Sequence, residues 1–91
     1  MKVKGKTKTG FKFEVDKDQL SNWELLEKIA EMQHGDGMAA FEVLGILLGK
    51  DQKKRLYDHC RDDKGMVPVD AITAELSDIT NALAEANETK N

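Results

Sequence analysis

The chain has 91 residues, of which 40% are apolar and 34% are charged, and its formal net charge at pH 7 is −3. This length allows one domain, and the composition is too apolar for a disordered chain and too charged for a membrane protein. We expect a cytoplasmic globular domain, because the N-terminal lysines are not followed by the apolar run of a secretory signal. The single cysteine, Cys60, excludes an internal disulfide, which fits a reducing compartment.

A β-hairpin is predicted for residues 2–15. Lysines occupy every second position from residue 2 to residue 8, and apolar side chains then recur at every second position as Phe11, Phe13 and Val15. In a strand, side chains alternate between opposite faces with a period of two residues. We therefore expect the aromatic face to cover the rest of the domain and the lysines to lie in solvent. Gly10 can adopt the positive φ of a bulged hairpin turn.

Two helices are predicted after the hairpin. The first covers about 22–33, begins at a capping box of Ser21 and Glu24, and has a wide apolar face that includes Trp23. The second covers about 37–48 and begins at Asp36 as the N-cap. Apolar groups surround nearly its whole circumference, so this helix must be enclosed by other parts of the domain or by another molecule.

Two further helices complete the predicted domain. Gly49 is expected to end the second helix, and Asp51 is expected to cap a third helix at about 51–62, a surface helix with a narrow apolar stripe. The fourth covers about 69–86 and spaces its apolar residues by three and four, as in a helix that packs lengthwise against another. The predicted fold class is therefore α+β and mainly α, with a compact bundle of four helices after the hairpin. One domain spans residues 1–86, with a frayed tail at 87–91.

No catalytic, cofactor-binding or metal-binding residue is predicted, and the chain is interpreted as non-enzymatic. Asp58, His59 and Cys60 are consecutive and would point in different directions on a helix, whereas a zinc site needs ligands that converge, usually in spaced pairs. A cysteine nucleophile would need a base and a third orienting group, and no recognised signature surrounds Cys60. A small packed side chain is the favoured interpretation of this cysteine.

Charge is distributed unevenly along the chain. Residues 1–12 contain five lysines and no acidic residue, whereas the rest of the chain is acidic. Nucleic acid is therefore disfavoured as a partner, because the acidic remainder would oppose the phosphate backbone. No membrane partner is predicted either, since the longest mainly apolar run, at 37–49, is interrupted by Glu42 and is shorter than the roughly 20 residues that cross a bilayer.

Candidate partner-binding residues come from the second helix and from the apolar seam of the fourth. One interpretation is that these side chains bury one another inside the monomer. The other is that part of this surface receives a helical partner or another copy of the chain. The candidates are Phe41, Leu44, Leu48, Val69, Ile72, Leu76, Ile79 and Leu83.

A family resemblance rests on four stretches and an acidic-apolar terminal helix that follows them. The stretches, in order, are GKTKTGFKFEVD, NWELLEKIAEM, GDGMAAFEVLGILLGKDQ and LYDHCRDDKGMVPVDAI. Together they resemble the small tail assembly chaperones of long-tailed bacteriophages and prophages of Gram-positive bacteria, from Lys4 to about Leu83. The resemblance implies a protein of the host cytoplasm that binds the tape measure protein, keeps it soluble and helps to recruit the tail tube protein. It also implies frequent self-association and absence from the mature virion. The alternative is a small phage or prophage regulator that contacts nucleic acid through the basic hairpin.

Overall fold

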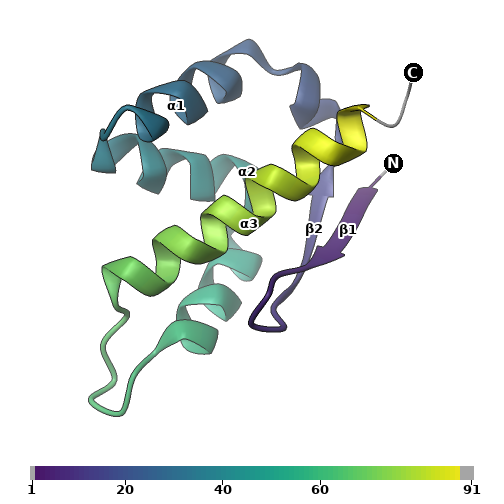
Figure 1. The fold of residues 1–91 in the computed structure, drawn as a ribbon. Coiled ribbons are helices and arrows are strands. Elements are labelled where there is room, and N and C mark those ends of the chain that lie inside the picture. The colour runs from purple at the N-terminus through teal and green to yellow at the C-terminus, as the bar shows by residue number, and fades with distance from the viewer. Residues whose placement is uncertain (1, 89–91) are drawn as a thin grey trace.

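The computed structural model describes residues 2–88, in which a two-stranded hairpin packs against three α-helices (Figure 1). The elements in chain order are β1 (Lys2–Lys6), β2 (Lys12–Asp16), a 3-10 helix η1 (Lys17–Ser21), α1 (Trp23–Gln33), α2 (Gly37–Cys60) and α3 (Val69–Glu88). The mainly helical α+β class is confirmed. The predicted number of helices is wrong, since the described part of the chain has three and not four.

The hairpin has the predicted alternation of faces. β1 and β2 are antiparallel, with Val3 opposite Val15. Phe11, Phe13 and Val15 are at most 4% exposed, whereas the lysines of the other face are exposed. Gly10 has a φ of 95°, as the turn requires. The alternation therefore places three apolar side chains in the core and the charged groups in solvent.

The N-cap of helix α1 lies one residue later than predicted, at Asn22 in place of Ser21. The Asn22 side chain accepts hydrogen bonds from the N–H groups of Glu24, at 3.1 Å, and Leu25, at 3.4 Å. Ser21 instead ends η1, so the predicted capping box is wrong. The reason is local: Asn22 has an extended backbone from which its short amide reaches the first free N–H groups, and asparagine is as good a cap as serine.

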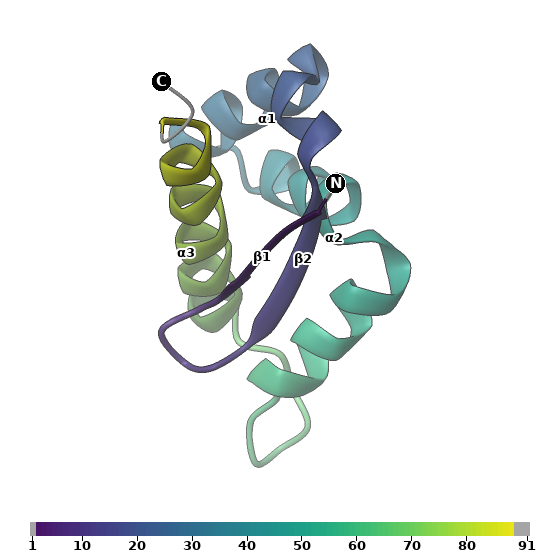
Figure 2. The same ribbon diagram turned by 90° about the vertical axis from the view of Figure 1, so that its right-hand side faces the viewer.

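Helix α2 joins the two segments that were expected to form separate helices. Asp36 caps its start as predicted, accepting from the N–H groups of Met38 and Ala39. Gly49 interrupts the helical geometry with φ 72° and ψ 176°, but the helix resumes at the next residue without a loop, and Asp51 lies inside it. A glycine tolerates this positive φ at little cost, so the chain bends there, as Figure 2 shows.

The core lies where the aromatic face of the hairpin meets α1, α2 and α3. From α3 it takes the middle of the predicted apolar seam, Leu76, Ile79 and Leu83, which are at most 3% exposed. Each such side chain contributes about 1.5–3 kcal/mol when it leaves water. α3 continues to residue 88, so two residues of the predicted frayed tail are helical, and 89–91 lie outside the described residues.

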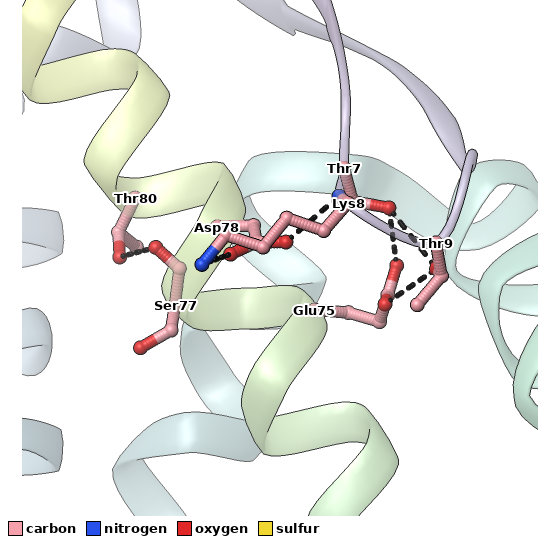
Figure 3. A network of polar contacts seen from close by, with 7 residues as sticks. All are labelled: Thr7, Lys8, Thr9, Glu75, Ser77, Asp78 and Thr80. Carbon is pink, nitrogen blue, oxygen red and sulfur yellow. Dashed lines mark hydrogen bonds and ion pairs between the residues drawn. The ribbon is translucent and has the colours of Figure 1, made fainter.

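Polar contacts attach the hairpin turn to α3 (Figure 3). The Glu75 carboxylate, whose residue is only 2% exposed, accepts hydrogen bonds from the hydroxyls of Thr7 and Thr9, each at 2.7 Å. Next to it, the N–H of Lys8 donates to Asp78 at 2.9 Å. The turn is therefore held against one side of α3 by two carboxylates that lie about one helical turn apart.

No helix within residues 2–88 combines the length and the hydropathy needed to cross a membrane.

Candidate functional site

The structure divides the eight candidate partner-binding residues by burial. Five of them are in the core and are at most 5% exposed: Leu44, Leu48, Leu76, Ile79 and Leu83. For these five residues, the first interpretation is correct: their apolar side chains bury one another inside the monomer. A partner could not reach these side chains without opening the domain, except where the edge of one of them lines a surface groove.

Four of the eight candidates line one apolar groove, of about 310 Å3, between the start of α2 and the start of α3. Phe41 and Val69 are 55% and 79% exposed, Ile72 is half-buried, and Leu44 contributes from the core. The remaining lining residues are Gly37, Ala40, Tyr57, Val67 and Thr73. We call this surface the Phe41 groove. Exposed side chains as large as these, gathered around a hollow, are typical of a protein-binding surface.

The bend at Gly49 builds the Phe41 groove. In a straight helix, Phe41 and Lys53 would be separated by about 18 Å along the axis, too far for their side chains to meet. In the structure the Lys53 ammonium lies 5.0 Å from the centroid of the Phe41 ring, a cation–π contact. Tyr57, still farther along α2, lines the same groove. Gly49 therefore positions two parts of one helix around a single binding surface.

A second apolar surface was not predicted as a site. Trp23 is 75% exposed and Leu26 is 46% exposed, and Leu26 borders a hollow of about 250 Å3 between α1 and α3 that Leu20 and Ile29 also line. The sequence placed Trp23 on the wide apolar face of its helix. The structure packs the adjacent stripe, with Leu25 buried, and leaves Trp23 outward, because one helix in a small domain cannot turn both stripes to the core.

His59 and Cys60 line one shallow hollow together with Thr9 and Glu75. The Thr9 hydroxyl donates to Glu75, so it accepts from the Nε2–H of His59, 2.9 Å away. Burial, and to a smaller extent the negative charge of Glu75, raises the pKa of the Cys60 thiol above its usual range. A thiol kept protonated is a poor nucleophile. Among the described residues, no group of three or more His, Cys, Asp or Glu side chains could hold a metal ion.

A basic groove lies between the hairpin and the second half of α2. Its volume is about 610 Å3, and its lining includes the cationic side chains of Lys4, Lys6, Lys12 and Arg55. Gln52 also lines this groove and connects α2 to β2. Its side-chain amide accepts a hydrogen bond from the N–H of Glu14 at 2.8 Å and donates one to the C=O of the same residue at 2.7 Å. The amide thus pairs with β2 as a neighbouring strand would, and it holds α2 beside the hairpin.

Comparisons of the chain with protein-family models, with curated proteins and with solved structures found no match.

Proposed function

We propose that the chain is a non-enzymatic tail assembly chaperone of a bacteriophage or prophage, which binds the tape measure protein in the Phe41 groove. In this proposal the chain keeps the tape measure protein soluble and helps to recruit the tail tube protein. It acts in the cytoplasm of the infected cell and is absent from the mature virion. The observation that carries the proposal is the Phe41 groove itself, an exposed apolar hollow whose lining includes four of the eight candidate partner-binding residues.

The chemistry of the Phe41 groove suits a helical client. An amphipathic helix offers apolar side chains at i, i+3, i+4 and i+7 to such a surface. Covering the side chains of Phe41 and Val69 would contribute about 1.5–3 kcal/mol each, and association itself costs several kcal/mol, so one groove alone binds weakly. Copies bound side by side along a long client gain affinity through avidity, which matches the role of a protein that coats its client.

Co-expression with the tape measure protein encoded in the same gene cluster tests this function. The chain is expected to increase the soluble fraction of the tape measure protein and to co-purify with it. Phe41→Glu and Val69→Glu are expected to reduce both effects, since each places a charge in the groove at an exposed position that leaves the core intact. Lys54→Glu, at an exposed position of α2 that does not line the groove, is the matched control. No gain in solubility and no co-purification would refute the proposal.

Self-association is a further part of the proposal. Copies would meet through the exposed apolar side chains of the Phe41 groove and through those of Trp23 and Leu26 on α1. Light scattering is expected to detect species larger than a monomer, and Phe41→Glu or Trp23→Glu is expected to reduce them. A monomer at every concentration would exclude self-association and leave client binding to be tested separately.

A second candidate function is a regulator that binds nucleic acid, and the basic groove is the observation that favours it. Lysine and arginine side chains supply most of the affinity for a phosphate backbone, and they release counterions when they bind it. A regulator of this kind should bind DNA with an affinity that falls steeply as the salt concentration rises. Weak binding with a shallow salt dependence would exclude it.

A further inference from the structure

The hairpin carries an uncompensated pair of like charges on its solvent face. The strand register places Lys4 opposite Glu14, which balances one pair, but it places Lys6 directly opposite Lys12. Side chains directly opposite on antiparallel strands are neighbours on the same face, and like charges there destabilise the pairing. The end of the hairpin nearest the turn therefore has an excess of positive charge that the fold alone does not explain.

Arg55 of α2 adds to this excess. Its guanidinium lies 5.3 Å from the centroid of the Phe11 ring, at the border between the basic groove and a second hollow of about 510 Å3. Both hollows are lined by Lys12 and Arg55, so they adjoin each other at these two side chains. Among the described residues that line this second hollow, the one acidic residue is Asp58, and it already pairs with Arg61 at 3.1 Å.

The cations of the basic groove form no ion pair within the described residues, although Glu14, which lies opposite Lys4, also lines the groove. No carboxylate of residues 2–88 lies within 4.0 Å of the charged groups of Lys4, Lys6, Lys12 or Arg55, in contrast to Lys8, Lys28 and Arg61, which are paired. With four cations and one carboxylate in its lining, the groove has a net positive charge. Such a hollow attracts anions, because its low-dielectric walls strengthen the field inside it.

The spacing of the cations favours an extended peptide as the ligand. Lys4 and Lys6 are two residues apart on one strand, a separation of about 6.6–6.8 Å, and carboxylates at every second position of an extended peptide have the same separation. Nucleic acid fits less well, because Phe11 and Phe13 are at most 4% exposed and offer no face on which a base could stack. The acidic remainder of the chain would also repel a long phosphate backbone.

We propose that the basic groove binds an extended segment of a partner protein that carries acidic side chains at every second position. This site is separate from the Phe41 groove and does not depend on the chaperone function. It gives the chain a second attachment surface, of opposite chemistry to the first: one groove takes apolar side chains and the other takes carboxylates.

The test uses a fluorescein-labelled six-residue peptide in which glutamate and glycine alternate, with binding followed by fluorescence anisotropy at low and at physiological salt. A peptide with glutamine in place of glutamate is the neutral control, and a labelled single-stranded oligothymidylate is the nucleic-acid control. The variants are Lys6→Gln, Lys12→Gln and Arg55→Gln. Lys54→Gln is the matched control, because Lys54 is the exposed neighbour of Arg55 and does not line the groove. Circular dichroism confirms that each variant is folded.

The acidic peptide is expected to bind, to bind less tightly as salt increases, and to bind more tightly than either control ligand. Each groove variant is expected to weaken its binding about two- to five-fold, as for the loss of an exposed charge pair, whereas Lys54→Gln is expected to leave it unchanged. Equal binding of the glutamine peptide, or an equal loss in all four variants, would overturn the proposal. If the oligothymidylate binds more tightly than the acidic peptide, and the same three variants weaken its binding, the groove is assigned to nucleic acid instead.

Discussion

The attachment of the hairpin turn to α3 yields the sharpest stability prediction, and Thr7→Val is the variant that tests it. Thr7 is only 4% exposed, its hydroxyl donates to Glu75 at 2.7 Å, and the same oxygen accepts the N–H of Phe11 at 3.1 Å. Valine has nearly the same shape as threonine but can make neither hydrogen bond. The substitution therefore removes the polar contacts and changes the apolar packing very little.

The expected cost follows from burial and charge. A hydrogen bond to a charged group contributes about 1.5–3 kcal/mol, and the buried Glu75 carboxylate would keep the donor from Thr9 but lose the one from Thr7. We expect the free energy of unfolding to fall by about 2–3 kcal/mol, a large share of the 5–15 kcal/mol typical of a domain. Thr73→Val is the matched control, because the Thr73 hydroxyl bonds to the exposed backbone of its own helix. It is expected to cost less than about 0.5 kcal/mol.

Urea unfolding followed by circular dichroism measures both variants. With an m-value of about 1–2 kcal/mol per molar, the midpoint for Thr7→Val is expected to fall by about 1–3 M while m stays constant. A Thr7→Val midpoint as close to wild type as that of Thr73→Val would refute the reasoning. Apolar packing alone would then hold the hairpin against α3.

Three further predictions follow from individual contacts. Gly5→Ala is expected to destabilise the domain by about 1–3 kcal/mol in the same urea assay, because a Cβ there would lie 2.6 Å from the buried Phe13 ring; an unchanged midpoint would show that the ring can move aside. Cys60 is expected to react with iodoacetamide along a pH–rate profile whose midpoint lies above that of an unfolded cysteine, since burial raises its pKa; a midpoint at or below the unfolded value would contradict this. Hydrogen bonding to Glu42 raises the pKa of Lys28, so its contribution to stability is complete below the unfolded lysine pKa and is lost as the pH rises through the folded pKa. The stability difference between wild type and Lys28→Met should therefore shrink in strongly alkaline solution, and a difference that stays constant with pH would disprove the coupling.

Local patterns accounted for much of the fold. The alternation of lysines with apolar residues placed the hairpin and its buried face, because the period of two is a property of the extended backbone itself. The cap at Asp36 and the seam through Leu76, Ile79 and Leu83 were likewise visible, since caps and helical faces depend on residues only three or four positions apart. The cap of α1 was misplaced by one residue, because Ser21 and Asn22 are both good caps and only the backbone direction after η1 distinguishes them.

The candidate site was visible only in part. Phe41 and Val69 were named from their apolar character, but so were Leu48 and Leu76, which are core residues. Apolar side chains that bind a partner and apolar side chains that fill a core have the same chemistry. Their separation depends on which face of each helix meets the other elements, and one sequence carries no direct signal for that.

The sequence by itself determined the class of the fold, the faces of the hairpin, the positions of most helices and the basic character of the N-terminal edge. The tertiary structure alone decided that the helical segments on either side of Gly49 follow each other directly across a kink, that Trp23 faces outward, and that Arg55 joins the lysines of the hairpin. The physical reason is the range of the interactions. Periodicity, capping and turn chemistry act over a few residues, whereas both grooves are made by side chains that are far apart in the chain and meet only when the helices pack.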